Sequence, residues 1–213
     1  LTFLGTGTSQ GVPVIGCGCA VCTSTDPRDN RLRTSAMVEI GDKRFIIDAG
    51  PDFRQQMLRE GISHITAILL THKHKDHIGG IDDVRALNFV DYPQAVRAVH
   101  LYGSQDTCKC VRKDFDYAFA VNPYRGVPQI VLHEFGTQPF EIEGVEITPI
   151  RGEHSRFEVT GFRIGELAYM TDFKSISESE IEKLNGVKVL VVNALRFELH
   201  DSHFSVEEAL QLA

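Results

Sequence analysis

The sequence predicts a mixed α/β fold in which sheets pack face to face and helices cover their outer faces. Strands and helices alternate along the 213 residues, and the expected strands outnumber the expected helices. No internal repeat, low-complexity tract or linker interrupts them, which predicts a single domain over residues 1–213. With 42% hydrophobic and 24% charged residues, the chain has the composition of a globular protein and can bury a core.

The first half of the chain begins with the end of a short strand at Thr2–Leu4. A hairpin is expected where Gly41 and Asp42, a typical turn pair, separate two apolar segments. A short helix is expected after Pro51, with Gly61 just beyond its end. The other elements expected here are strands at Ala36–Ile40, Arg44–Asp48, Ala67–Leu70 and Ala98–Tyr102 and a helix at Val84–Phe89; residues 104–128 form a mixed segment.

The second half has mainly strand character up to Met170. Ser177 to Glu180 has the pattern of a capping box, which predicts a helix ending at Gly186. Ser205 to Glu208 is a second capping box, and its helix runs to the end of the chain. The expected strands are Ile130–Phe135, Phe140–Ile142, Val145–Ile150, Val159–Ile164, Leu167–Met170 and a buried Lys188–Val192.

Charge and composition exclude several classes of function. The chain has 22 basic and 29 acidic residues, a net charge of -7, so nucleic acid is not an expected partner. No apolar run approaches the roughly 18 residues of a membrane span, and the first residues lack the pattern of a signal peptide. A cytoplasmic location without membrane association is therefore expected.

The segment from Thr71 to His77 is the most informative feature of the sequence. Three histidines and one aspartate fall within six residues, directly after an apolar strand. Imidazoles two residues apart can converge on one cation, and the carboxylate with the last imidazole can turn toward a second. This donor set suits zinc or manganese better than calcium, whereas the alternative is a solvated polar loop. The candidate ligands are His72, His74, Asp76 and His77.

The pattern His72-x-His74-x-Asp76-His77 resembles the HxHxDH motif of the metallo-β-lactamase superfamily. The resemblance runs from Leu1 to Ala213 and implies a four-layer αββα sandwich. It also implies His154 as a further ligand, Asp172 as a bridging ligand, and Asp48 as a support for the metal loop. Each could instead be an ordinary loop or turn residue. The family has one more histidine, in a Thr-His-x-Ser-His-like segment with no counterpart here, so we expect a missing last strand and loop.

Cys17, Cys19 and Cys22 form a C-x-C-x-x-C cluster near the start of the chain. Three thiolates this close could hold a zinc ion with one further ligand, and a disulfide is the alternative. The run is similar to the N-terminal segment of phosphoribosyl 1,2-cyclic phosphate phosphodiesterases, where three such cysteines and a distant histidine form a structural zinc site. Cys108 and Cys110 match no motif, and we expect ordinary thiols there.

The same resemblance implies a function. In the phosphodiesterase branches, a histidine before the last capped helix serves acid catalysis or phosphate binding. His203 has that position in this sequence. The alternative is that His203 is only a residue at the entry to the helix. The expected activity is hydrolysis of a small, cyclic phosphodiester by a hydroxide bridging two metals, zinc or manganese, with His203 and Asp76 as the catalytic residues.

Two other functions fit the same pattern. One is a thioester or lactam hydrolase on the same fold, which the cysteine cluster and His203 disfavour. The other is a non-catalytic metal-binding module. The expected partner is a small phosphodiester substrate, and a homodimer is compatible with the sequence.

Overall fold

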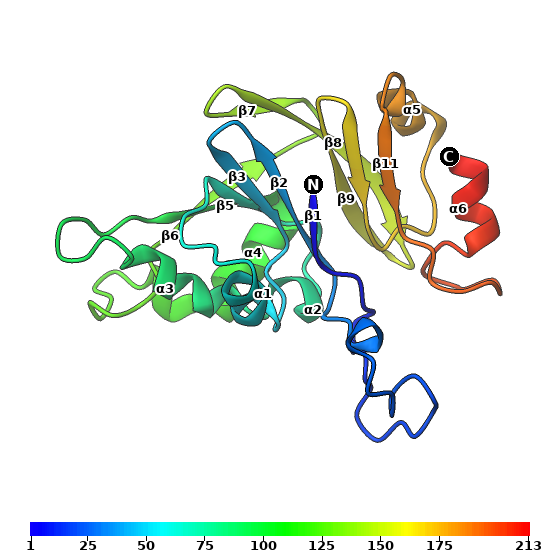
Figure 1. Ribbon diagram of the computed structural model, residues 1–213. Coiled ribbons are helices and arrows are strands. Elements are labelled where there is room, and N and C mark those ends of the chain that lie inside the picture. Colours follow the sequence, from blue (N-terminus) through cyan, green and yellow to red (C-terminus); the bar gives the residue numbers. More distant parts are fainter. The chain divides into compact units, whose positions relative to one another are not determined.

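The computed structural model describes residues 1–213, and the chain divides into two compact units, Leu1–Glu134 and Phe135–Ala213. Each unit is built around one sheet, as Figure 1 shows for the blue-to-green first unit and the yellow-to-red second unit. The expected mixture of strands and helices is confirmed in both units. The expectation of a single domain over the whole chain stays a prediction.

The sheet of the first unit contains its strands in sequence order, β1 to β6. The first three strands pair antiparallel, whereas β3, β4 and β5 pair parallel to one another. Gly41 has a φ of 62° in the turn between β2 and β3, so the predicted hairpin is confirmed. The strands are β1 (Thr2–Gly5), β2 (Ser35–Ile40), β3 (Lys43–Ile47), β4 (Ala67–Leu69), β5 (Val99–Ser104) and β6 (Ile130–Phe135).

The helices of the first unit are α1 (Phe53–Arg59), α2 (Lys75–Ile78), α3 (Arg85–Asn88) and α4 (Gln105–Asp114), with 3-10 turns at Pro27–Asp29, Ile81–Val84 and Asp116–Phe119. The helix after Pro51 is confirmed as α1, and Gly61 follows it with a φ of 63°. The predicted helix at Val84–Phe89 is confirmed as α3, which spans Arg85–Asn88 and directly follows a 3-10 turn at Ile81–Val84.

Helix α4 lies in the segment for which the sequence suggested no single structure. The hydroxyl of Ser104 accepts a hydrogen bond from the N–H of Thr107 and caps the helix. Cys108 and Val111 are buried, whereas most of the other residues of α4 are polar. Because so few apolar residues mark its buried face, their spacing does not reveal the helix in the sequence.

The core of the first unit fixes the end of β4. Ile68 and Leu70 are fully buried against Phe53 of α1, Leu101 of β5 and Val111 of α4. Truncating such a core side chain to alanine typically costs about 2–5 kcal/mol of stability. The residues that follow Leu70 therefore start from a rigid point.

The second unit contains a five-stranded sheet in the order β11-β10-β9-β8-β7. Strands β8 and β9 form a hairpin, and β10 and β11 pair parallel. Strand β8 reaches His154, four residues beyond its predicted end. The strands are β7 (Phe140–Ile142), β8 (Val145–His154), β9 (Phe157–Ile164), β10 (Leu167–Met170) and β11 (Val189–Val192).

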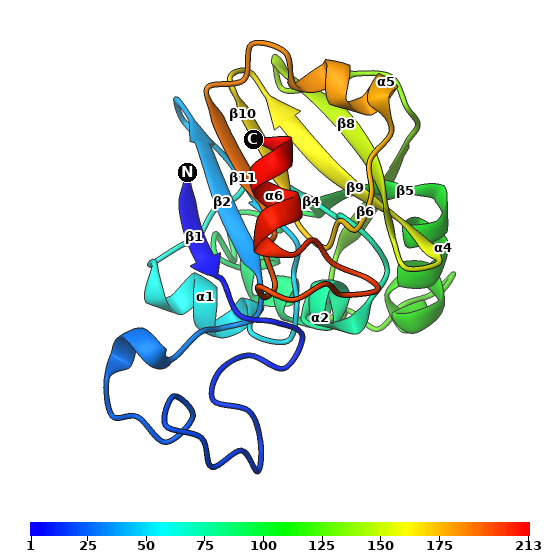
Figure 2. The same ribbon diagram turned by 90° about the vertical axis from the view of Figure 1, so that its right-hand side faces the viewer.

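Helix α6 (Val206–Leu212) packs against β10 and β11 of this sheet, as Figure 2 shows. Its Ala209 joins Ala168, Met170 and Phe204 in one buried cluster. The predicted capping box is confirmed: Glu208 N–H donates to Ser205 Oγ over 3.3 Å, and Ser205 N–H donates to Glu208 Oε2 over 2.8 Å.

The other predicted capping box is wrong. Ser177 makes no capping bond; its hydroxyl instead contacts that of Ser179 at 3.1 Å. The carboxylate of Glu180 accepts the N–H of Arg151 over 2.8 Å and pairs with Lys183 at 2.7 Å. The helix there is short, α5 (Glu178–Ile181), followed by a 3-10 turn at Glu182–Leu184. The expected buried strand at 188–192 is β11, which is half-buried.

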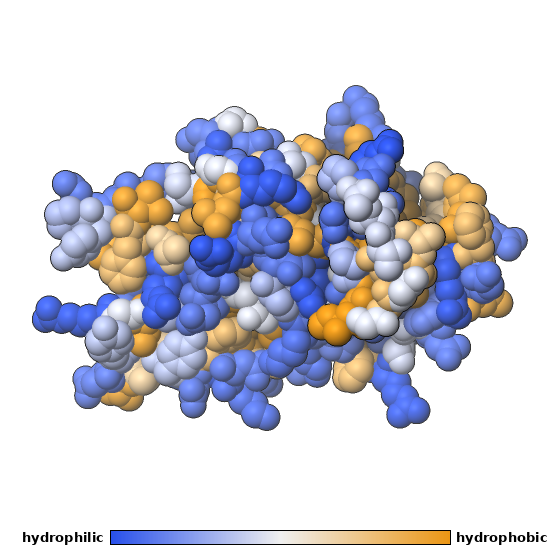
Figure 3. Space-filling model, turned by 60° about the horizontal axis from the view of Figure 1, so that its bottom comes forward, coloured by the Kyte–Doolittle hydropathy of each residue, from blue (hydrophilic) through white to orange (hydrophobic).

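No helix of the structure is both long and apolar enough to cross a bilayer. On the face drawn in Figure 3, hydrophobic residues appear as separate patches among hydrophilic ones. Almost fully exposed apolar side chains, such as Ile15 and Val121, belong to the first unit. Single exposed apolar residues of this kind are common on protein surfaces.

Candidate metal centre

The segment from Thr71 to His77, which we call the histidine loop, follows β4 and turns into α2. His72 and His77 are buried, and His74 is half-buried at the N-cap of α2. The ring centroid of His72 lies 4.6 Å from that of His74 and 4.2 Å from that of His77. The structure therefore gathers the three histidines that the sequence singled out.

Two glycines allow the backbone to fold closely around this loop. A Cβ atom on Gly50 would lie 1.9 Å from the carbonyl oxygen of Asp76, and one on Gly80 would lie 2.0 Å from that of Gly50. Real side chains do not fit at such distances. The strand-end segment that contains Asp48 is thereby held directly against the histidine loop.

Asp48 supports the histidine loop through three hydrogen bonds. Its Oδ1 accepts the N–H of Thr71 over 2.8 Å, and its Oδ2 accepts the Thr71 hydroxyl over 2.8 Å. Oδ2 also lies 2.7 Å from Nδ1 of His77. Burial raises the pKa of Asp48, and the hydrogen bonds from His77 and Thr71 oppose that rise.

The hydrogen bond between His77 and Asp48 determines which nitrogen of the imidazole carries the proton. A carboxylate only accepts hydrogen bonds, so Nδ1 of His77 carries the proton and Nε2 has the lone pair of a metal ligand. An imidazole held in this way by a carboxylate is the usual arrangement of a metal-binding histidine. Oδ2 of Asp76 lies 3.3 Å from that Nε2, so a carboxylate oxygen and an imidazole nitrogen face the same place. These residues fit a divalent metal such as zinc or manganese.

In the second unit, His154, Asp172 and His203 come together from three different segments. His154 ends β8, Asp172 follows β10 with a φ of 61°, and His203 precedes α6. The ring of His203 lies 4.7 Å from that of His154, and Nδ1 of His203 lies 3.5 Å from Oδ1 of Asp172. The structure therefore also gathers the predicted residues of this unit.

The buried ring of His154 is oriented as that of His77 is. Its Nδ1 lies 2.7 Å from the carbonyl oxygen of Ser202, which can only accept a hydrogen bond. Nδ1 is therefore the protonated nitrogen, and Nε2 has the lone pair of a ligand. The same Ser202–His203 segment thus holds one candidate ligand and supplies the candidate acid.

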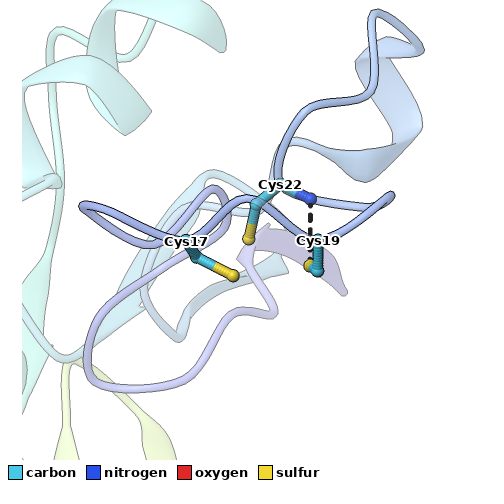
Figure 4. Close-up of side chains that lie close together, drawn as sticks. All are labelled: Cys17, Cys19 and Cys22. Atoms are coloured by element: carbon cyan, nitrogen blue, oxygen red, sulfur yellow. Dashed lines mark hydrogen bonds between the residues drawn. The ribbon is translucent and has the colours of Figure 1, made fainter.

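The three N-terminal cysteines lie in a long loop of the first unit between β1 and β2 (Figure 1). Figure 4 shows their three side chains close together. Their Sγ atoms lie within 4.8 Å of one another, and all three are free thiols. The N–H of Cys22 donates to Sγ of Cys19 over 3.5 Å. This bond and the neighbouring thiols lower the pKa of Cys19 to about 7. No disulfide joins any two of these cysteines in this structure.

Sequence reasoning missed Thr71. Its hydroxyl lies 3.0 Å from Nδ1 of His72 and donates to Asp48, which in turn holds His77. Thr71 therefore supports His72 directly and His77 through Asp48. The available signal was its place between a buried apolar strand and the histidines. The interpretation also missed Lys73 and Lys75, whose partners lie on the unpredicted helix α4.

A β-lactamase superfamily domain model matches residues 43–213, and the chain belongs to this superfamily. Within it, the chain is of the PhnP-like type. A crystal structure described as a new diphosphatase from the PhnP family is 42% identical, with a TM-score of 0.90 over 100% of this chain and 80% of that chain. This similarity confirms the predicted αββα sandwich class.

Two curated relatives extend the comparison. An octanoyltransferase of Porphyromonas gingivalis is 42% identical over 212 residues, which are 98% of this chain but only 42% of that protein. The chain therefore spans less than half of that relative, whose name describes a much longer protein. A ribonuclease Z of Mycobacterium marinum is 27% identical over 88% of this chain and 77% of its own length.

Proposed function

We propose that the protein is a metal-dependent phosphoric diester hydrolase that acts on a small, cyclic phosphodiester. The observation that carries the proposal is the shared orientation of His77 and His154. Each ring donates through Nδ1 to a protein acceptor and keeps Nε2 for a metal. The similarity to a PhnP-family diphosphatase and a ribonuclease Z favours phosphate esters over other substrates of the superfamily.

Two divalent metals, zinc or manganese, are the proposed cofactors. When bound, they would supply Lewis-acid charge to the phosphoryl oxygens and lower the pKa of a water molecule toward neutrality. They would also let a chain of net charge -7 bind an anionic substrate. The residues that would hold these metals are His72, His74, Asp76, His77, His154 and Asp172.

The protein's own groups then have distinct tasks. Asp48 holds His77 in one tautomer, and Ser202 does the same for His154. Nδ1 of His203 lies 3.5 Å from Oδ1 of Asp172, and we assign Nε2 of His203 as the donor of a proton to the leaving oxygen. Water attacks phosphorus in line and loses a proton to solvent, the ester P–O bond breaks, and the leaving oxygen takes the proton from Nε2 of His203.

We also propose that Cys17, Cys19 and Cys22 hold a structural zinc ion with one further ligand. The support is the proximity of their three sulfur atoms and the lowered pKa of Cys19, because zinc binds thiolates. Free thiols are typical of proteins in a reducing compartment, so we also propose a cytoplasmic location. A homodimer is a further proposal.

A side-by-side assay tests the proposed activity on the full-length protein. Metal-loaded protein is given bis-p-nitrophenyl phosphate and a thioester, and each rate is compared with those of the His72→Ala and His154→Ala variants. We expect hydrolysis of the phosphodiester that both variants lose. Hydrolysis of the thioester alone would show the other activity of the fold. Fewer than about one bound transition metal per chain would count against the proposed enzyme.

A further inference from the structure

The two lysines of the histidine loop are tied to helix α4. Lys73 and Lys75 stand on either side of His74 in the sequence. Nζ of Lys73 lies 2.7 Å from Oδ2 of Asp106, and Lys75 forms a close ion pair with Asp114. Two ion pairs therefore join one helix to the segment that carries the candidate ligands.

Helix α4 presents these acids on one face. Asp106, Cys110 and Asp114 are spaced four residues apart, so their side chains follow one another along the helix. The thiol of Cys110 donates to Oδ2 of Asp114 over 3.1 Å, and its sulfur lies 4.0 Å from the carbonyl oxygen of Lys73. We call Asp106, Cys110 and Asp114 the α4 clamp.

The α4 clamp lies on a helix that is capped at its start and packed into the core of the first unit. Ser104 caps α4, and its buried Val111 belongs to the core cluster that also contains Ile68 of β4. Each ion pair has one exposed partner: Lys75 is 64% exposed beside Asp114 at 25%, and Lys73 is 31% exposed beside Asp106 at 72%. Because exposed ion pairs contribute little by themselves, we take Asp114 as the main residue on the ground that it also accepts the Cys110 thiol. Consistent with this, Lys75 and then the Cys110 thiol lower the pKa of Asp114.

We propose that the α4 clamp is a positioning element that sets how tightly the histidine loop binds a divalent metal, with Asp114 as its main residue. This inference rests on the proposed function only in that the loop binds metal. The ion pairs restrict the backbone on both sides of His74. Asp114 also balances the charge of Lys75, an ammonium one residue from His74 and Asp76 that would otherwise oppose a bound dication.

The test compares three variants of the full-length protein. Asp114→Asn removes the charge of the clamp, Asp114→Glu restores it, and Asp116→Asn removes the same charge from an exposed side chain two residues further on. Zinc affinity is measured by competition with a chromophoric chelator. Cobalt absorption then separates the histidine loop from the cysteine cluster, because only thiolates add a charge-transfer band.

We expect Asp114→Asn to weaken metal binding at the histidine loop about tenfold, as losses behind metal ligands do. Asp114→Glu should recover part of this loss of affinity. The zinc affinity of Asp116→Asn should stay within about twofold of that of the unaltered protein. The loss caused by Asp114→Asn should shrink at high salt, because salt screens charges. Equal affinities for Asp114→Asn and Asp116→Asn would overturn the proposal. So would a loss that only follows global unfolding of the variant, measured by circular dichroism. An unaltered protein that binds no metal at the loop would overturn the proposed function and the clamp with it.

Discussion

Nδ1 of His77 lies 2.7 Å from Oδ2 of Asp48, and both side chains are almost completely buried. The carboxylate belongs to the segment after β3, and the imidazole belongs to α2. Because Thr71 donates to both oxygens of Asp48, the carboxylate has little freedom to turn. The side chain of His77 is therefore oriented before any metal binds.

Replacing Asp48 by asparagine should weaken metal binding. The amide places a donor where an oxygen now accepts, so one of three buried donors loses its partner. We expect about 10–100-fold weaker metal binding and a loss of about 1–3 kcal/mol in the free energy of unfolding. Chelator competition and urea unfolding measure the two effects. Asp42→Asn, at the exposed turn of the same hairpin, is the control and should change neither.

His203→Ala should separate acid catalysis from metal binding. If Nε2 of His203 protonates the leaving oxygen, kcat should fall about 10²–10⁴-fold for an alkyl phosphodiester. An ester of p-nitrophenol needs little protonation and should lose much less. Metal content should match that of the exposed-histidine control His64→Ala. An equal loss on both esters would refute the role as acid.

Glu208 makes stability depend on pH. Its hydrogen bonds with Lys174 and then Ser205 lower its pKa from 4.5 to about 2. The stabilisation is therefore complete above about pH 4.5 and is lost as the pH falls through about 2. The urea midpoints of the unaltered protein and Glu208→Gln should differ most at pH 7 and converge in acid. The exposed Glu207→Gln gives the baseline, and a constant difference down to pH 2 would contradict the assignment.

Zinc should protect the cysteine cluster from alkylation. With zinc bound, Cys17, Cys19 and Cys22 should react slowly with iodoacetamide at pH 7.5, and a chelator should expose all three together. Cys108 is an internal control, because burial raises its pKa to about 11 and it should stay unmodified in both states. Mass spectrometry of the peptides measures each site. Unchanged reactivity after chelation would exclude a zinc ion at the cluster.

Features set by local sequence were predictable. The β2–β3 hairpin follows from Gly41, and the cap of α6 follows from Ser205 and Glu208, because each depends on residues a few positions apart. The histidine loop was predictable for the same reason, since its three histidines lie within six residues of one another in the sequence. The supporting role of Asp48 came from family resemblance, and the structure supplies its hydrogen bonds.

Features set by distant contacts were not predictable. Ser177 lacks its capping partner because Arg151 and Lys183 occupy the carboxylate of Glu180. Strand β8 continues to His154 because Gly152 leaves room for a ring; a Cβ atom there would lie 2.2 Å from Cε1 of Phe173. Neither contact can be read from neighbouring residues.

The proposed function is a phosphodiesterase activity that depends on bound metal. The most direct test is the rate of bis-p-nitrophenyl phosphate hydrolysis by full-length protein as zinc or manganese is added back after chelation. The proposed function predicts no activity without metal and a rate that rises until about two metals are bound besides the zinc of the cysteine cluster. Full activity of the chelated protein, or none at any metal content, would contradict it.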